Sequence, residues 1–387
     1  MSDSIPIPIP QEGGIAPPPA VSVSLPALRH ERFSFTGRTG EYFRIWIVNL
    51  FLTIVTVGLY SPWAKVRKKR YLYGNTWLAG SNFEYHGNAV AILKGRLLAF
   101  SAFVAYSLAT HYSPRFAAAI ALAVMPAAPW LVVRSFAFNA VNSSYRNIRF
   151  HFDGRYREAL AALAPLALIP ALTLILPQLD PAHPPRGLRE MWFLFVPSAI
   201  LFLVYPYVAA KVKLLHVNRA RFGTSAFRCG ASVGAFYGIY VLAMLLFMLL
   251  LFVLGIVVAA GMFVSPVILA VLVPVGYFVV AAFMLAFTRA QIANLVFNAT
   301  RLDGRVALRS TLSVFGLARI YAFNLAAIAL TLGFAVPWAV VRTCRYRAER
   351  LALAAQDDIE SFVAGVTRDV AAAGEEMGEM FDVDLSL

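Results

Sequence analysis

Residues 44–71 read RIWIVNLFLTIVTVGLYSPWAKVRKKRY, and residues 319–346 read RIYAFNLAAIALTLGFAVPWAVVRTCRY. Aligned without a gap, the two segments are identical at 13 of 28 positions. Identical apolar residues are expected by chance between two apolar segments. Chance does not explain the match of Asn49 with Asn324 or the shared Pro-Trp and Arg-Tyr dipeptides. We interpret the two segments as copies of one element near opposite ends of the chain.

The composition places this element in a membrane. Of the 387 residues, 60% are hydrophobic and 14% are charged, whereas soluble domains have roughly 45–50% and 25%. Apolar runs close to the ~20 residues that cross a bilayer occur at 45–64, 97–113, 116–133, 159–176, 191–210, 233–260, 264–287 and 320–341. We therefore predict an all-α polytopic membrane protein with six to eight transmembrane or re-entrant helices.

Basic residues alternate between the connections of these runs. Four connections hold 22 Lys and Arg in total, and the three connections between them hold three. Short basic loops remain on the cytoplasmic side of a bacterial membrane, so we predict that the four basic connections are cytoplasmic. The same rule accounts for the net charge of +14 without nucleic acid as a partner.

Two topologies remain open, because the runs at 45–64 and 320–341 are basic on both flanks. In the first, all eight runs span the membrane and both termini lie outside. In the second, these two runs are re-entrant hairpins, six runs span, and both termini lie inside. Re-entrant backbone must be enclosed by protein or water. The repeat favours the second topology, because only one membrane face favours clustered Arg.

Short alternating segments in the basic connections predict small cytoplasmic β-elements. Aromatic and polar residues alternate and end in Gly, which is typical of a strand closed by a turn. The segments are RFSFTGR at 32–38, FEYHG at 83–87, RFHFDGR at 149–155 and ATRLDGR at 299–305.

The chain divides into three parts by composition. Residues 1–28 are rich in Pro and lack the basic and apolar regions of a signal peptide, so we expect a disordered lead. Residues 29–350 form the membrane domain, with its internal repeats at 44–71 and 319–346. Residues 351–387 form an acidic C-terminal tail, in which we expect a helix followed by a soluble end.

A family resemblance begins in residues 33–87, which read FSFTGRTGEYFRIWIVNLFLTIVTVGLYSPWAKVRKKRYLYGNTWLAGSNFEYHG. This segment resembles the opening of the YjgN-like family, bacterial inner-membrane proteins classed under a domain of unknown function. The string LDGRVALRSTLSVFGLARIY at 302–321 resembles the C-terminal segment of that family. The resemblance covers residues 30–350, leaving out the Pro-rich head and the acidic tail. It implies a multi-pass protein of the bacterial inner membrane and supplies no activity, substrate or catalytic residue.

Polar residues inside the two copies are the first candidates for function. Asn49 and Asn324 lie within apolar runs, where a polar side chain must find a partner or face a cavity. Arg44 and Arg319 precede them by five residues and can present two cations to a shared path for an anion. The competing interpretations are hydrogen bonding between helices for the Asn pair and snorkelling to the interface for the Arg pair.

The basic run at 65–70 is a second candidate. It comprises Lys65, Arg67, Lys68, Lys69 and Arg70. Such a run next to aromatic residues favours contact with anionic lipid headgroups, and its competing interpretation is an orientation signal. No metal-ligand spacing, cofactor motif or catalytic motif is present in the sequence, so we expect neither a metal, a cofactor nor an enzymatic activity.

These features favour a transporter-like or channel-like protein of the bacterial inner membrane, acting on an anionic solute or lipid. Gly and Pro interrupt both copies of the repeat, as in transporters built from repeated broken helices. The alternative is a scaffold or lipid-organising protein that transports nothing. The expected partners are the lipid bilayer, anionic lipids at its cytoplasmic face, an anionic solute and further copies of the chain as a homo-oligomer.

Overall fold

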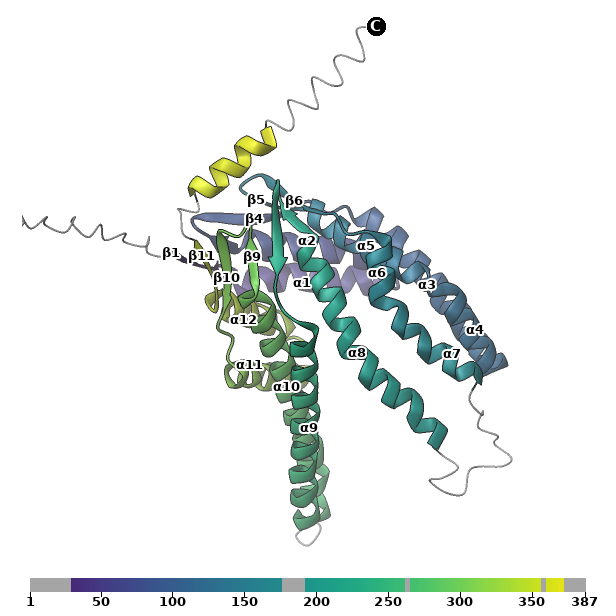
Figure 1. Ribbon diagram of the computed structural model, residues 1–387. Coiled ribbons are helices and arrows are strands. Elements are labelled where there is room, and N and C mark those ends of the chain that lie inside the picture. The colour runs from purple at the N-terminus through teal and green to yellow at the C-terminus, as the bar shows by residue number, and fades with distance from the viewer. Residues whose placement is uncertain (1–28, 176–191, 262–264, 356–359, 372–387) are drawn as a thin grey trace, which may run out of the picture.

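The computed structural model describes residues 29–175, 192–261, 265–355 and 360–371. Within these residues, eleven antiparallel strands form one sheet at one end of the molecule, and the long helices extend away from it (Figure 1). The strands are β1 (Arg29–Arg32), β2 (Ser34–Phe35), β3 (Thr76–Leu78), β4 (Ser81–Tyr85), β5 (Ser143–Tyr145), β6 (Ile148–Phe152), β7 (Ala220–Phe222), β8 (Ser225–Cys229), β9 (Thr300–Leu302), β10 (Val306–Ser310) and β11 (Leu351–Ala355).

The sheet closes into a ring. Its strand order runs β1-β11-β10-β9-β8-β7-β6-β5-β4-β3-β2, so β1 and β2 stand at its two ends. Only Phe33 separates β1 from β2 in the chain, and its N–H donates to the carbonyl of Leu351 at 3.1 Å. Strand β1 pairs with β11, and β2 pairs with β3. A single extended segment therefore joins the two ends of the sheet, which leaves it without a free edge.

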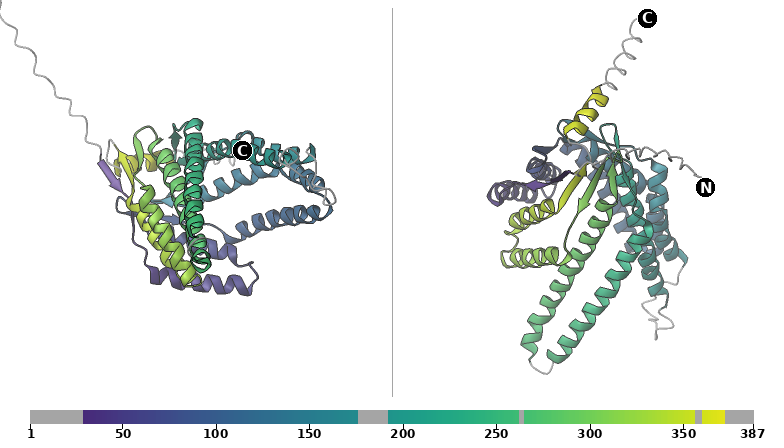
Figure 2. Two further views of the ribbon diagram at one scale, coloured as in Figure 1. Left: turned by 90° about the horizontal axis from the view of Figure 1, so that it is seen from below. Right: turned by 60° about the vertical axis from the view of Figure 1, so that its left-hand side comes forward.

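Five helical segments connect neighbouring strands of the ring. Their helices are α1 (Thr39–Val55), α2 (Ser61–Gly74), α3 (Ala89–Tyr112), α4 (Pro114–Val124), α5 (Ala127–Val141), α6 (Tyr156–Leu163), η1 (Ala164–Ala167), α7 (Leu168–Ile175), α8 (Trp192–Asn218), α9 (Val233–Gly261), α10 (Pro266–Asn298), α11 (Val314–Leu330) and α12 (Val336–Glu349). Viewed from below, the helical segments are arranged around a common centre (Figure 2).

The number of candidate spans agrees with the second predicted topology. By length and composition, the described residues contain five helices that can cross a membrane, or six if the pair α4 and α5, bent by 47°, is one span. The apolar runs at 45–64 and 320–341 instead each break into two short helices, α1 with α2 and α11 with α12. Each short pair leaves the ring and returns to it, so neither run forms a single long helix, which favours six spans over eight.

The two short pairs turn in the same way. Val57 and Gly58 have φ values of 50° and 89°, and Leu332 and Gly333 have values of 49° and 98°. At both turns a threonine hydroxyl, from Thr56 or Thr331, accepts the N–H four residues later at 2.9 Å. The Pro of each Pro-Trp dipeptide then lies in the first turn of the second helix, where its missing N–H is not needed.

The aromatic-Gly pattern of the predicted β-elements has a packing cause. The rings of Phe35, Tyr85 and Phe152 lie over the glycine two residues later, where a Cβ atom would approach them to 2.6 Å or less. Only glycine leaves room for the ring at this point, where each strand ends and the chain turns toward the next helix. The repeated sequence pattern therefore marks the exit of the chain from the ring.

The fold differs from the predicted one in one respect: it is not all-α, because the predicted separate β-elements join into one sheet. The segments at 149–155 and 299–305 each contain a strand followed by a turn, as predicted, but the turns lead to different elements. Asp153 follows β6 and precedes a helix, whereas Asp303 lies in the turn from β9 to β10 with φ of 51°. Pattern alone could not separate them, because a strand end before a helix and one before a hairpin use the same turn residues.

Residues 360–371 form a helix that packs on the ring, which we call the C-terminal helix. Val363 and Val366 are buried in the same apolar cluster as Leu302 and Val306 of the ring. Strand β11 also belongs to the ring. The ordered fold thus extends beyond the predicted boundary at residue 350, whereas the predicted disordered lead at 1–28 lies outside the described residues.

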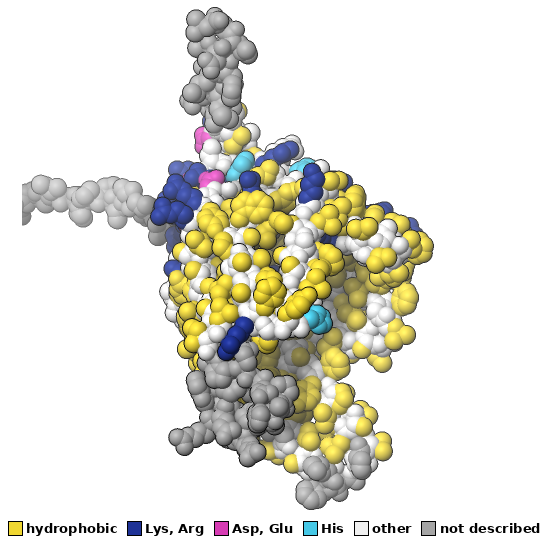
Figure 3. Space-filling model, turned by 90° about the vertical axis from the view of Figure 1, so that its right-hand side faces the viewer, with side chains coloured by type: hydrophobic (Ala, Val, Ile, Leu, Met, Phe, Trp, Pro, Cys, Tyr) yellow, Lys and Arg dark blue, Asp and Glu magenta, His cyan; other side chains and the backbone are white. Residues whose placement is uncertain are grey.

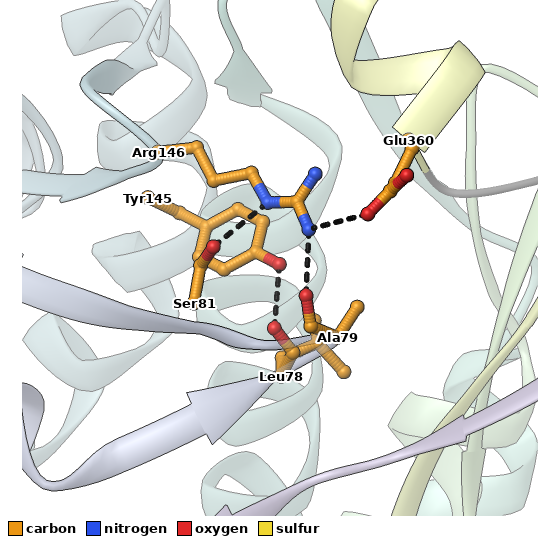
Figure 4. A network of polar contacts seen from close by, with 6 residues as sticks. All are labelled: Leu78, Ala79, Ser81, Tyr145, Arg146 and Glu360. Atoms are coloured by element: carbon orange, nitrogen blue, oxygen red, sulfur yellow. Dashed lines mark hydrogen bonds and ion pairs between the residues drawn. The ribbon is translucent and has the colours of Figure 1, made fainter.

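An arginine holds this helix against two strand turns. The Arg146 guanidinium donates to the carbonyl of Ala79 at 2.6 Å and to the hydroxyl of Ser81 at 3.0 Å, and it lies 3.8 Å from the Glu360 carboxylate. The hydroxyl of the neighbouring Tyr145 donates to the carbonyl of Leu78 at 2.7 Å (Figure 4). Two hairpins of the ring and the C-terminal helix are thereby connected at one point.

Candidate functional site: two joined cavities under the ring

The first cavity lies inside the ring and has a volume of about 450 Å³; we call it the ring cavity. Its wall is almost entirely apolar and aromatic, because alternate residues of each strand point inward. The inward-facing side chains are Phe33, Thr76, Leu78, Phe83, Tyr145, Phe150, Phe222, Phe227, Leu302, Val306, Leu308, Leu351 and Leu353. Phe362 and Val363 of the C-terminal helix also line it.

The second cavity lies among the helices and has a volume of about 670 Å³; we call it the basic cavity. It is bordered by residues of α5, α8, α9, α10 and α12, and its cationic side chains are Lys213, Arg289 and Arg347. The charges of Arg289 and Arg347 both act on Lys213. None of the described residues that line this cavity is acidic, and within the described part of the chain these three cations form no ion pair.

Phe297 and Arg347 line both cavities, so the two spaces meet at these side chains. Arg347 extends from α12, near the point where that helix leads into β11. Cys344, one turn earlier on α12, lines the ring cavity. Burial raises the pKa of the Cys344 thiol, and the charges of Arg347 and Lys68 oppose that rise. The arrangement places an apolar chamber directly beside a cluster of fixed positive charge.

Arginines also cover the outside of the ring. The residues between the inward-facing ones point outward, and the exposed arginines among them are Arg32, Arg149, Arg221, Arg228, Arg301 and Arg309. Arg228 and Arg301 stand directly opposite each other on β8 and β9, a placement that is destabilising without a counter-charge. On the face in Figure 3, Lys and Arg gather at the ring end, and hydrophobic side chains cover the helices below.

The structure places the predicted path residues away from both cavities. Asn49 and Asn324 are buried in the short pairs, where the Asn324 amide donates to the carbonyl of Ala339 at 3.2 Å and to the hydroxyl of Thr343 at 3.0 Å. The Oδ1 atoms of both asparagines have no hydrogen-bond partner among the described residues. Asn324 therefore connects α11 to α12, which is the competing interpretation of the sequence.

The predicted arginine pair lies on a different side of its helices. Arg44 and Arg319 are exposed, whereas Asn49 and Asn324 are buried, because five residues correspond to about one and a half helical turns. Neither arginine lines one of the two cavities. The structure does not bring the four residues together at one path.

The basic run on α2 is mostly solvated. Lys65, Arg67, Lys68 and Arg70 are exposed. Lys69 is partly buried: its ammonium group lies 2.5 Å from Oδ1 of Asn139 and 4.6 Å from the centre of the Tyr85 ring. Burial lowers the pKa of Lys69, and the nearby charge of Lys65 lowers it further. Lys69 thus joins α2 to α5, and the other four remain available to headgroups.

Sequence reasoning missed the three cations of the basic cavity as a group. Each lies in or beside a basic connection, where Lys and Arg act as signals for the orientation of the chain in the membrane. Lys213 and Arg289 nevertheless fall inside α8 and α10, five and nine residues before these helices end. The apolar runs at 191–210 and 264–287 end before Lys213 and Arg289, so only the longer helices of the structure place these two residues within candidate spans. Within the described residues, no three His, Cys, Asp or Glu side chains come together to hold a metal.

Comparison with known proteins gives a family but no activity. The family described as "Bacterial protein of unknown function (DUF898)" matches residues 30–380, and thus includes most of the tail that the sequence resemblance left out. Inner membrane protein YjgN of Salmonella typhimurium is 34% identical over 146 residues, 37% of each chain. YjgN proteins of Escherichia coli O157:H7 and K12 are each 30% identical over 122 residues, 31% of each chain.

The aligned segments span about a third of the length of these relatives. No solved structure matches this chain. Together with the apolar helices, the relatives identify a multi-pass protein of the bacterial inner membrane.

Proposed function

Because this chain belongs to the DUF898 family of bacterial proteins of unknown function, we propose its role from its own geometry: it binds an anionic solute or lipid beneath the ring and moves it across the inner membrane. The proposal is a transporter-like role without enzymatic chemistry. It keeps the substrate class that the sequence favoured and assigns it to different residues.

The basic cavity is the observation that carries this proposal. Three cations from three helices, Lys213, Arg289 and Arg347, line one space of about 670 Å³. Like charges that line one cavity repel each other, so an anion bound among them is stabilised. The volume falls within the range of ~300–1,000 Å³ that small-molecule sites occupy.

The position of the cavity supports transport. Candidate spans carry two of the cations, Lys213 on α8 and Arg289 on α10, and charged residues within spans mark the paths of ions and substrates. The third, Arg347, belongs to a short pair that starts and ends at the ring. Movement of the short pair relative to α8 and α10 would therefore change the spacing of the three cations.

Flux through liposomes tests the proposal. The full-length protein is reconstituted in phosphatidylcholine, and two probes are followed: efflux of trapped inorganic phosphate and exchange of fluorescent phosphatidylglycerol between leaflets. We expect at least one probe to move faster than in empty liposomes. Arg289→Gln or Lys213→Gln should slow that movement about tenfold or more, because a hydrogen bond to a charged group contributes ~1.5–3 kcal/mol.

Lys211→Gln is the matched control, because Lys211 lies on the same helix and is not among the cavity-lining residues. It removes the same charge and should leave movement unchanged. Absence of movement for both probes with folded protein, or an equal loss in Lys211→Gln and Lys213→Gln, would contradict the proposal.

A second role, that of a lipid-organising scaffold, is favoured by the outer arginines of the ring. The facing pair Arg228 and Arg301 would be stabilised by an anionic headgroup between them. This role predicts that Arg228→Gln with Arg301→Gln weakens binding to phosphatidylglycerol bilayers while no solute moves. Loss of flux with unchanged lipid binding would instead favour transport.

A further inference from the structure

We propose that the ligand is a single-chain amphiphile, whose anionic head lies among the cations of the basic cavity and whose apolar chain occupies the ring cavity. This inference rests on the proposed function and names its substrate class. A small inorganic anion would use only the basic cavity and would leave the apolar chamber beside it without a role.

The wall of the ring cavity supports an apolar occupant. Its inward-facing side chains come from strands around the whole ring, and all except Thr76 are aromatic or aliphatic. The hydroxyl-bearing residues of the wall are Tyr73, Thr76 and Tyr145, and the hydroxyls of Thr76 and Tyr145 already donate to the carbonyls of Leu72 and Leu78. A water-filled chamber of about 450 Å³ would find few hydrogen-bond partners here, whereas an alkyl chain needs none.

The junction of the two cavities determines the orientation in which the ligand binds. Phe297 and Arg347 line both spaces, so a molecule that extends from one to the other passes the Arg347 guanidinium. Charge complementarity places the anionic group there, with Lys213 and Arg289 beyond it. The apolar part then points into the ring, toward Leu308 and Phe227.

The C-terminal helix forms an apolar wall of the ring cavity. Phe362 and Val363 line the ring cavity from this helix, and Val363 and Val366 are buried against strand residues. The chamber therefore ends at an apolar surface, so it accepts a chain of limited length and excludes a head group at that end. A second polar group at the chain terminus would lie unsatisfied against Phe362.

Occupancy of the ring cavity can be measured by how strongly a bound ligand protects Cys344 from a thiol reagent. In a Cys229→Ser background Cys344 is the single cysteine, and it lines the ring cavity. Its rate of reaction with a small thiol reagent is measured on the full-length protein in amphipol, with butyl, hexyl, octyl and decyl phosphate. We expect the half-protecting concentration to fall about fourfold for each added methylene until the chamber is filled. Inorganic phosphate should not protect.

Two tryptophan substitutions form a matched pair. Leu308→Trp fills the chamber and should abolish protection by decyl phosphate, because Leu308 lines the cavity. Ala226→Trp introduces the same side chain on the outer face of the ring, beside the inward-facing Phe227, and should leave protection intact. Arg347→Gln should raise the half-protecting concentration about tenfold or more. If Leu308→Trp does not fold, the chain-length series with the parent protein decides alone.

Protection that is independent of chain length, or equal protection by inorganic phosphate, overturns the inference. If phosphate or lipid flux is slowed by Lys213→Gln while no alkyl phosphate protects Cys344, the inference of an amphiphilic ligand is contradicted and the proposed transport function is retained. If decyl phosphate protects Cys344 but neither flux probe moves, the ring cavity binds an amphiphile and the transport role fails.

Discussion

At the scale of single residues, the glycines that lie under aromatic rings have no room for a larger side chain. A Cβ atom on Gly87 would lie 2.5 Å from the Tyr85 ring, and that ring is buried and packs 5.5 Å from the Tyr73 ring. We expect Gly87→Ala to lower the free energy of unfolding by about 1–3 kcal/mol, the range for overpacked sites, measured by thermal unfolding in detergent.

Gly95→Ala is its control, because nothing lies within 4 Å of a Cβ atom there. Gly95 is inside α3, where alanine is the better helix former by ~1 kcal/mol, so this variant should be neutral or slightly stabilised. Equal melting temperatures for Gly87→Ala and the parent protein would show that the Tyr85 ring can move aside.

The buried asparagines give a prediction that separates packing from transport. Asn324→Leu removes two hydrogen bonds between α11 and α12 and also the unsatisfied Oδ1 atom. Since hydrogen bonds between helices in membranes contribute ~0.6 kcal/mol on average, we expect a loss of stability of about 1 kcal/mol and unchanged flux. Arg319→Gln, on the exposed side of the same helix, should change neither quantity. Lost flux at full stability in Asn324→Leu would restore the predicted path.

At the scale of elements, the contacts of the C-terminal helix can be used to test access to the ring cavity. It is held by the apolar stripe that contains Val363 and Val366 and by the Glu360 carboxylate near Arg146. Burying one valine contributes ~1.5–3 kcal/mol, whereas an unpaired buried carboxylate costs more than that. We expect Val366→Asp to release the helix and to increase the labelling rate of Cys344 about tenfold or more.

Ala364→Asp serves as the comparison, since Ala364 is exposed on the same helix. It adds the same charge and should leave the labelling rate of Cys344 at the parent value. If both variants label at the parent rate, the C-terminal helix does not limit access to the ring cavity.

The short pairs are elements whose structure can largely be predicted from their own sequences. Their lengths, turn threonines and Pro-Trp positions all follow from the two matching sequences, because turns and helix starts depend on a few adjacent residues. The strands β3, β5 and β7 are each three residues long, too short for a reliable period of two. The sequence therefore predicted the short pairs in register and the strands β4, β6 and β9, but it missed β3, β5, β10 and both strands of the β7–β8 hairpin.

At the scale of the whole molecule, both ends of the described fold meet at the ring. Strand β1 pairs with β11. The strands in the connections rich in Lys and Arg all belong to the same sheet. Basic connections lie in the cytoplasm, so reporter fusions at residues 30 and 387 should both give a cytoplasmic signal. A periplasmic signal from either fusion would contradict this orientation.

Membrane character, the basic face and the matching short pairs follow from the sequence, because composition and local pattern reflect interactions between near neighbours and with the bilayer. The candidate site does not follow from it. Lys213, Arg289 and Arg347 come from three helices, and no spacing along the chain shows that they share a cavity. The sequence match between 44–71 and 319–346 favours Asn49 and Asn324, but it is the closure of the ring, through pairing of β1 with β11, that creates the ring cavity beside the cations. Closure depends on the twist and stagger of all the strands together, which is a property of the assembled fold.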